Sequence, residues 1–419
     1  MADAVRDGQT ALALRLAKHL AEDGFAGKSK NMAFAPLSIH AALALVTAGA
    51  RGATEAQLLS FHGAPSAADL AAFGRRMADT VLADQMEDES APRVLFGGGV
   101  WVDASCGGLK KAFRDVATKS YKSQARTVNF ADDPEEAVEI INDWVKKATN
   151  NLINSLFYPS DINADTALVV ATAVYFKGLW RNPFHRANTS PRQFHLLDGS
   201  CVKAKFMSKS SQSQFISCLD GFKVLKLPYL SPWKTKADAA HAAPLKRRGG
   251  PGAAAAVDAD DTQFSMFFFL PDEQLGIANM VDMITAAPSY LQSILPKTMV
   301  ENVQVTLPKF EISFDWDLGK DLQRLGLSLP FSRDVGDLRG MFQKPDMRRP
   351  MFVTKAMQKV IIKVDEAGTE AASIMRGFCG GGLPPDMVPF VADHPFSFLI
   401  MEERSGVIVF AGHVLDPTK

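Results

Sequence analysis

The segment from residue 364 to 386, VDEAGTEAASIMRGFCGGGLPPD, contains few side chains that can fill a core. It follows the strand-like run VIIKV and consists mainly of small residues, with three consecutive glycines and two prolines. A flexible loop usually favours Ser, Lys, Asp and Asn, whereas this one carries Thr-Glu-Ala-Ala-Ser-Ile at 369–374. Hydrophobic residues make up 47% of the chain, so the other segments have enough apolar side chains to form a core. We therefore expect a fold that keeps a long segment of small residues outside its core.

Helical patterns dominate the first 160 residues. Leu12, Leu16 and Leu20 recur at the spacing of one helix face. The clearest start signal is Asp133-Pro134, because Asp caps a helix N-terminus well and Pro fits the first helical turn. The apolar residues expected on one face of this helix are Val138, Ile141, Val145, Ala148 and Leu152.

Strand patterns dominate the rest of the chain. Residues 302–307 alternate, with apolar side chains at every second position. Residues 264–270, FSMFFFL, are nearly all apolar, which is typical of a strand buried on both faces. The runs 396–401 and 407–414 flank EERSG, a hairpin signal. Helices first and strands later predict the α+β class.

The charge balance argues against several kinds of partner. Lys plus Arg and Asp plus Glu each number 46, so the formal net charge is zero. A neutral chain gives no reason to expect binding to nucleic acid or to an acidic membrane surface. No run approaches the ~18 apolar residues of a membrane span. We expect a partner recognised through shape and short-range contacts.

The cysteines indicate a reducing environment. The four of them, Cys106, Cys201, Cys218 and Cys379, are too few and too scattered for a disulfide framework or a metal site. The first residues also lack the uninterrupted apolar core of a secretory signal. We expect a cytoplasmic or nucleocytoplasmic protein. Unconventional export to the extracellular space or apoplast is the alternative.

One segment, residues 236–262, differs from its surroundings in composition. It reads KADAAHAAPLKRRGGPGAAAAVDADDT, which is Ala, Gly, Pro and charge with almost nothing to bury. Such a composition predicts a low-complexity loop inserted into the fold. The basic cluster 246–248 is interpreted as solvated loop charge rather than a targeting signal.

The sequence contains no H-E-x-x-H, G-x-S-x-G or C-x-x-C motif and no Walker loop. The glycines at 97–99 continue into a strand pattern, which favours a bulge or a close backbone approach over a phosphate site. Cys379 and His394 form an imaginable nucleophilic pair, but a poly-glycine stretch offers no fixed scaffold for a catalytic thiol. We predict no catalytic residues, no metal and no cofactor, and hence no enzyme.

Several segments together resemble the serpins, and their amino-acid sequences are most similar to those of the plant serpin group. GTEAAS at 368–373 is followed by FVADHPFSFLI at 390–400 and by GVIVFAGHVLDP at 406–417. Supporting segments occur along nearly the whole chain except 236–262. They are 31–59, 98–105, 174–184, 219–229, 307–327 and 353–372.

The resemblance implies a single domain over 1–419, with three β-sheets, eight or nine helices and an exposed reactive-centre loop at 366–390. It implies a metastable, monomeric, irreversible suicide-type inhibitor of serine or cysteine endopeptidases. In this mechanism the target protease cleaves the loop, and the loop inserts into the central sheet as a new strand. The alternative is a non-inhibitory serpin that acts as a storage, carrier or binding protein.

The resemblance also assigns a hinge at the start of the loop, and the residue types fit that role. Its members are Glu366, Gly368, Thr369, Glu370, Ala371, Ala372 and Ser373. Side chains alternate between the two faces of a strand, so on insertion Thr369, Ala371 and Ser373 would face inward. These side chains are small and uncharged, which suits entry between two existing strands.

Three further sites follow from the resemblance. The cleaved bond is expected at Gly382–Leu383, within the range Gly381 to Leu383. At the breach, where loop entry begins, Glu366 is expected to form an exposed pair with Lys309, with Trp180 nearby. The shutter, the polar cluster beneath the central strands, corresponds to Ala35, Ser38, Thr172 and Gln358. The family usually has Ser, Ser, Asn and His there, so either Thr172 and Gln358 rebuild the network or insertion is slowed.

Overall fold

The computed structural model describes residues 2–25, 30–83, 92–230, 262–345, 348–369 and 387–419, to which the structural statements below refer. This part of the chain contains nine α-helices. They are α1 (Ala2–Phe25), α2 (Pro36–Gly49), α3 (Gly52–His62), α4 (Ala67–Asp79), α5 (Lys111–Tyr121), α6 (Pro134–Ala148), α8 (Gly276–Ile284), α9 (Pro288–Ile294) and α10 (Leu318–Arg324). None of these helices combines the length and the apolarity needed to cross a lipid bilayer.

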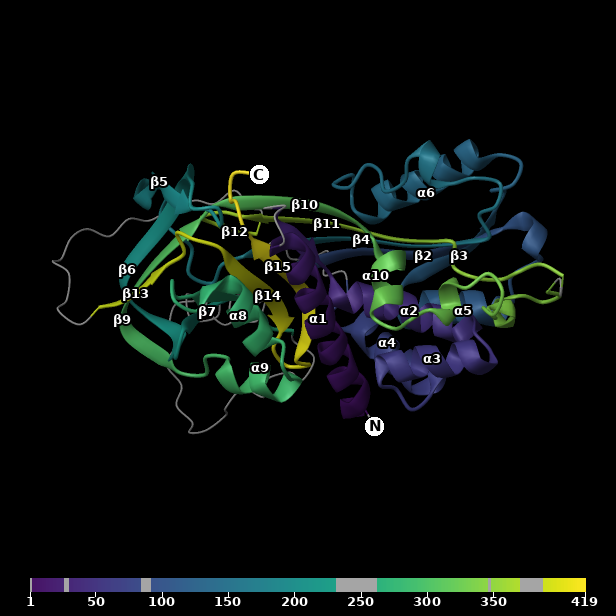
Figure 1. Cartoon of the computed structure of the whole chain (residues 1–419), viewed down its shortest axis with the longest axis horizontal. Helices are drawn as coiled ribbons and strands as arrows, with labels where there is room; N and C mark the ends of the chain where they lie inside the picture. Colours follow the sequence, from purple (N-terminus) through teal and green to yellow (C-terminus); the bar gives the residue numbers. More distant parts are fainter. Residues whose placement is uncertain (1, 26–29, 84–91, 231–261, 346–347, 370–386) are drawn as a thin grey trace, which may run out of the picture.

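A six-stranded sheet runs through the centre of the molecule in the order β10-β11-β12-β4-β2-β3 (Figure 1). Helix α6 lies on one face of this sheet, and helices α2 to α5 lie on the other (Figure 1). The strands are β2 (Arg93–Asp103), β3 (Ser123–Val128), β4 (Leu168–Leu179), β10 (Phe310–Asp317), β11 (Lys355–Val364) and β12 (Gly368–Thr369). Because both faces are covered, β4 reads as a continuous apolar run rather than an alternating one.

The two faces of β4 belong to different hydrophobic clusters. Leu168, Val170 and Val174 pack into the main core, whereas Val169, Ala171 and Ala173 lie in the cluster beneath α6. Small side chains on the α6 face leave space for the tryptophans of that cluster.

The three glycines of β2 provide the same kind of space without a bulge. β2 pairs with β4 in unbroken register through all of them. A Cβ on Gly97 would lie 3.1 Å from the ring of Trp144, and one on Gly99 would lie 2.3 Å from the ring of Trp101. The two indole rings meet edge to face, with centroids 4.8 Å apart. The bulge is wrong, and the groups that approach these glycines closely are side chains rather than a neighbouring backbone.

The second sheet has nine strands. They are β1 (Met32–Phe34), β5 (Thr189–His195), β6 (Cys201–Leu219), β7 (Phe222–Pro228), β8 (Phe264–Pro271), β9 (Met299–Pro308), β13 (Val388–Val391), β14 (Phe396–Glu402) and β15 (Val407–Val414). The resemblance implied two smaller sheets here. The structure joins them because β6 and β9 stay paired through two register shifts near residues 209–214. Such irregularities let one strand serve two differently oriented parts of a sheet.

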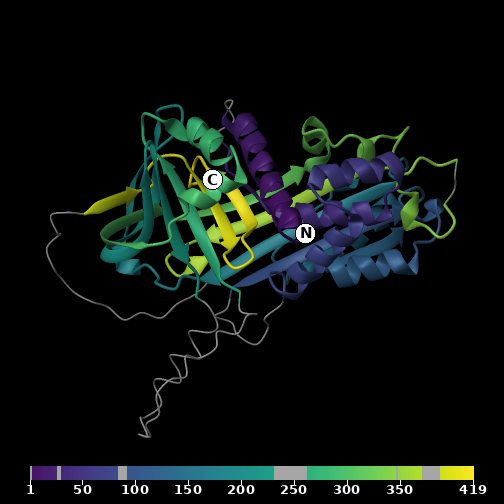
Figure 2. The same ribbon diagram turned by 90° about the horizontal axis from the view of Figure 1, so that it is seen from below.

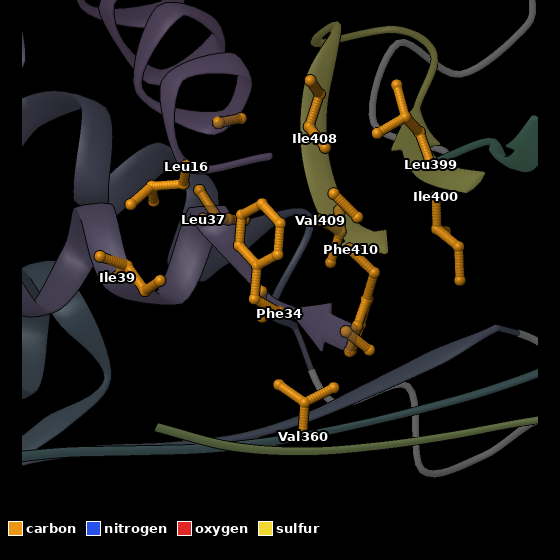
Figure 3. Packing of buried hydrophobic residues seen from close by; sticks show 14 of the residues in the cluster. Leu16, Phe34, Leu37, Ile39, Val360, Leu399, Ile400, Ile408, Val409 and Phe410 are labelled. Atoms are coloured by element: carbon orange, nitrogen blue, oxygen red, sulfur yellow. The ribbon is translucent and has the colours of Figure 1, made fainter. Parts of the chain in front are cut away.

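The main core lies where the two sheets and the first helices meet. Figure 3 shows Val360 of β11 pointing toward Phe34 of β1, with side chains of α1, α2 and the β14–β15 hairpin around them. Helix α1 crosses between the half that contains the nine-stranded sheet and the half that contains α2 to α5 (Figure 2). Its predicted apolar face is confirmed, since Leu12, Leu16 and Leu20 are all buried.

The α+β class and most local predictions are confirmed. Asp133 caps α6 and accepts a hydrogen bond from the backbone amide of Glu136. The 264–270 strand is buried throughout, and the expected hairpin is β14–β15. One helical prediction is wrong: α6 ends at Ala148, so Leu152 lies beyond it and is exposed.

Two predicted segments lie largely outside the described residues. Of the 236–262 insertion only Thr262 is described, and it is buried beside the start of β8. Of the predicted loop 366–390, residues 366–369 and 387–390 are described. The first part contains β12, and the second contains the start of β13.

Candidate functional site

The first residues of the predicted loop lie inside the central sheet. Strand β12 pairs antiparallel with β4, so that Gly368 is opposite Leu179 and Thr369 is opposite Gly178. Thr369 is also the partner of Val364 of β11. Along the rest of their length β11 and β4 pair directly with each other, in parallel. The chain therefore enters the space between β4 and β11 at their C-terminal ends, which we call the β4–β11 gap.

Position 368 requires glycine, because the backbone of β4 lies very close to it. A Cβ at this position would lie 2.0 Å from the carbonyl oxygen of Gly178. No side chain fits at that distance, because real Cβ contacts are longer than ~3 Å. The amide of Trp180 donates to the carbonyl of Ala367 at 2.8 Å, which continues the pairing next to this point.

Thr369 contacts Tyr229, which forms an aromatic pair with Trp180. Its side chain is fully buried, and its hydroxyl lies 2.8 Å from the hydroxyl of Tyr229. Tyr229 stacks on Trp180, with ring centroids 4.6 Å apart and planes 17° apart. Burial raises the pKa of Tyr229 far above its ordinary value, so the phenol stays protonated and can donate or accept. In this structure Thr369 already faces the interior of the molecule.

Glu366 occupies the breach, but it is not exposed as we expected. Only 9% of its side chain is accessible, against 33% for Lys309. Lys309 Nζ donates to Glu366 Oε2 at 2.7 Å, and Thr189 Oγ1 donates to Oε1 at 2.8 Å. Burial raises the pKa of Glu366, but the hydrogen bonds from Lys309 and Thr189 outweigh it, and the pKa lies below its usual value. The carboxylate is thus buried, charged and held by two donors.

The residue before Glu366 fixes the turn into the gap. Asp365 Oδ1 accepts hydrogen bonds from the amides of Ala367 at 2.9 Å and Gly368 at 3.3 Å. Trp180 Nε1 donates to the carbonyl of Asp365 at 3.0 Å. Trp180 therefore lies at the breach as predicted, although its polar contact is with the backbone rather than with the Lys309–Glu366 pair.

The predicted shutter residues come together beneath the sheet and form a network. Gln358 of β11 lies directly opposite Thr172 of β4. Gln358 Oε1 accepts from the amide of Ala35 at 3.0 Å, and Nε2 lies 2.8 Å from Ser38 Oγ and 3.3 Å from Thr172 Oγ1. All four residues are buried. Of the two outcomes left open by the sequence, the structure supports the first: the glutamine and threonine rebuild a connected network.

Some predicted site residues lie outside the described part of the chain. These are the hinge members Glu370 to Ser373, the range Gly381 to Leu383 that contains the expected reactive bond, and Cys379. Within the described residues, no group of three or more His, Cys, Asp or Glu side chains could hold a metal ion. His394 contacts Asp393 and the carbonyl of Pro271.

Sequence reasoning missed two participants. Thr189 is 177 residues from its partner Glu366, and Tyr229 is 140 residues from Thr369. Neither residue stands out in its local pattern. Tyr229 closes the LPY run, but only the fold shows that its hydroxyl reaches the loop.

Comparisons with known proteins agree with this geometry. A family model described as serpin (serine protease inhibitor) matches residues 7–417. Putative serpin-Z8 from Oryza sativa subsp. japonica is 39% identical, with 99% of this chain and 96% of the relative covered. Serpin-ZXA from the same organism is 40% identical, with 98% and 96% covered. The native stressed conformation of Arabidopsis AtSerpin1 superposes with a TM-score of 0.84 at 33% identity, covering 100% of this chain and 99% of that one.

Proposed function

Because the chain belongs to the serpin family, whose members are protease inhibitors rather than enzymes, we propose that it is an irreversible, suicide-type inhibitor of serine or cysteine endopeptidases. A protease attacks the loop that follows Thr369. The cut loop then inserts between β4 and β11 and carries the acylated protease with it. The reactive bond is proposed at Gly382–Leu383, within the range Gly381 to Leu383.

The observation that carries this proposal is the position of Gly368 and Thr369. They are hydrogen-bonded into the central sheet at the C-terminal ends of β4 and β11, where further residues of the same segment would continue as a strand. Fifteen residues in a strand span roughly 50 Å. Complete insertion would therefore displace a tethered protease by about the length of a domain.

The shutter supports inhibition over the storage, carrier or binding alternative. Insertion requires β4 and β11 to separate, and the Gln358–Thr172 contact of 3.3 Å joins them. We expect a network with missing partners to slow insertion. Here the contacts are present, and they are few enough to break during insertion.

A gel assay tests the proposal. The protein is incubated with trypsin-like, subtilisin-like and papain-like proteases, and the products are separated in SDS. We expect an SDS-resistant adduct with at least one of them. Cleaved loop and free protease in every lane would contradict inhibition and favour the binding alternative.

Position 369 offers a matched pair of variants for the same assay. Thr369→Arg places a charge in a fully buried site and should convert the protein from inhibitor to substrate, with the loop cut and no adduct. Thr369→Ser keeps the hydroxyl that contacts Tyr229 and should retain the adduct. Equal adduct from both variants would show that loop insertion is not what traps the protease.

Thermal unfolding supplies an independent measurement. Insertion of a cut loop adds a strand to the central sheet, so nicking should raise the melting temperature strongly if the native state is metastable. An unchanged melting temperature after nicking would mean that the sheet does not accept the loop.

Two further expectations accompany this function. Exposed free thiols at Cys201 and Cys218 support a reducing location, cytoplasmic or nucleocytoplasmic. A fluorescent fusion expressed in plant cells would detect the alternative, an apoplastic protein. We also propose a monomer, which light scattering at working concentration would check.

A further inference from the structure

A hollow of about 490 Å³ lies beside the breach and is lined by an excess of positive charge. Its basic side chains are Arg186, Lys205 and Lys309, which come from the turn before β5, from β6 and from the junction of β9 and β10. Arg186 and Lys205 are exposed to solvent. The hollow is thus open, and three cationic groups from separate segments line it.

The acidic groups of the hollow are already engaged. Glu366 is bound by Lys309 and Thr189. Asp365 accepts two backbone amides through Oδ1. Within the described part of the chain, neither Arg186 nor Lys205 has an acidic partner. Two cations therefore remain available at the wall of the hollow, and Ser190 is part of the same lining.

We propose that this hollow binds a phosphate dianion, either inorganic phosphate or the phosphate group of a small metabolite, through Arg186, Lys205 and Lys309. A guanidinium offers planar paired donors for an oxyanion, and lysine ammonium groups add point charges. The three cations and two carboxylates of the lining leave an excess of one positive charge. A phosphate group has enough oxygens to contact all three cationic side chains, which favours phosphate over a monocarboxylate.

Binding of phosphate in the hollow would affect the Lys309–Glu366 pair at the breach. The importance of this coupling for loop insertion rests on the proposed function. Lys309 is the only cation that contacts Glu366 among the described residues. A phosphate that approaches Lys309 competes with the carboxylate of Glu366 for the same ammonium group. Coupling is reciprocal, so a ligand that weakens this pair also loosens the residues that lead into the β4–β11 gap.

Isothermal titration calorimetry at constant ionic strength tests the site without any protease. Inorganic phosphate and glycerol 3-phosphate are titrated separately into the full chain at about pH 7.5, where most of the phosphate is dianionic. Binding of both assigns the site to phosphate groups in general, and binding of only one identifies free phosphate or an ester as the source. Binding of neither overturns the proposal.

Matched charge variants locate the site. The double variant Arg186→Gln/Lys205→Gln should bind phosphate about tenfold more weakly or worse, because it removes both unmatched cations. Arg192→Gln/Lys203→Gln makes the same charge change on the same β5–β6 hairpin, at exposed residues outside the hollow, and should bind as the wild type does. An equal loss in both double variants would show nonspecific charge attraction only, and would overturn the assignment.

Glu366→Gln tests the competition directly. Removing the carboxylate charge eliminates repulsion and frees Lys309, so phosphate affinity should rise by roughly threefold or more. Unchanged or weaker binding would refute the competition with Glu366. Since calorimetry does not involve adduct formation, failure of the phosphate site and failure of protease trapping are observed separately.

Discussion

At the scale of single residues, the buried hydroxyl pair beneath the hinge is the most specific contact of the site. Tyr229 and Thr369 share one hydrogen bond of 2.8 Å, and both side chains are buried. Tyr229→Phe leaves the threonine hydroxyl without this partner at a cost of ~1–2 kcal/mol. We expect faster amide hydrogen exchange at Gly368 and Thr369, while exchange in β8 stays unchanged. Unaltered exchange at the hinge would mean that backbone pairing alone holds it.

The Lys309–Glu366 pair should respond asymmetrically to substitution. Lys309→Met leaves a carboxylate that is 9% exposed with only Thr189 as a side-chain donor, whereas Glu366→Gln leaves an ammonium that is 33% exposed. The first change should lower stability by ~1–3 kcal/mol, and the second by less, because water can solvate the lysine. Thermal melting of the two variants gives the comparison. The reverse order would show that Glu366 is better solvated than its accessibility indicates.

At the scale of secondary-structure elements, the packing of α6 on the central sheet depends on glycines in β2. Gly99→Ala would bring a methyl group within 2.3 Å of the Trp101 ring, which the cluster can relieve only by moving. Overpacking of this kind costs ~1–3 kcal/mol. Gly108→Ala, where no atom lies within 4 Å of the new methyl group, is the control and should be neutral. Equal melting temperatures for both variants would contradict a tight α6 interface.

The shutter joins β4 and β11 and should control how readily the two strands separate. Gln358→Met keeps a similar volume but removes the acceptor for the Ala35 amide and the donor to Ser38. Buried groups left without partners cost ~1–3 kcal/mol each. We expect a lower melting temperature of the intact protein, because buried contacts between β11 and its neighbours are lost. Intact protein that melts as the wild type does would show that water replaces the glutamine.

At the scale of the whole molecule, buried histidines predict lower stability in acid. Burial lowers the pKa of His62 and of His413 from 6.5 to about 4, and it also lowers that of His40. The unfolded chain therefore binds more protons than the folded one between about pH 6.5 and 4, and stability falls as the pH falls through this window. Each of the first two histidines contributes up to ~3 kcal/mol of this loss.

His394 acts in the opposite direction. Burial lowers its pKa, but hydrogen bonds to Asp393 and Pro271 outweigh burial and raise it, so its stabilising effect is present in acid and lost as the pH rises. Three buried histidines destabilise the fold in acid and one stabilises it. The melting temperature should therefore decrease as the pH is lowered from 7.5 to about 4.5. His62→Gln should flatten the curve. A melting temperature that rises toward acid would contradict this balance.

The sequence by itself determined the parts of this protein that depend on local chemistry. The capping Asp133, the alternation along β9 and the apolar run of β8 follow from periodicity and side-chain preference, and all three are confirmed. The resemblance of several ordered segments supplied the family and the pairing of Glu366 with Lys309. The local inferences need no knowledge of which distant segments meet, whereas the distant pairing came from the family resemblance.

Only the tertiary structure decided how the site is held together. The burial of Glu366, its second donor Thr189 and the contact between Tyr229 and Thr369 join residues far apart in the chain. The resemblance placed Gln358 and Thr172 in one cluster, but the hydrogen bonds that Gln358 forms there follow only from the sheet register. Hydrogen bonds between distant side chains depend on the relative placement of whole elements, and that placement is set by the packing of the complete core.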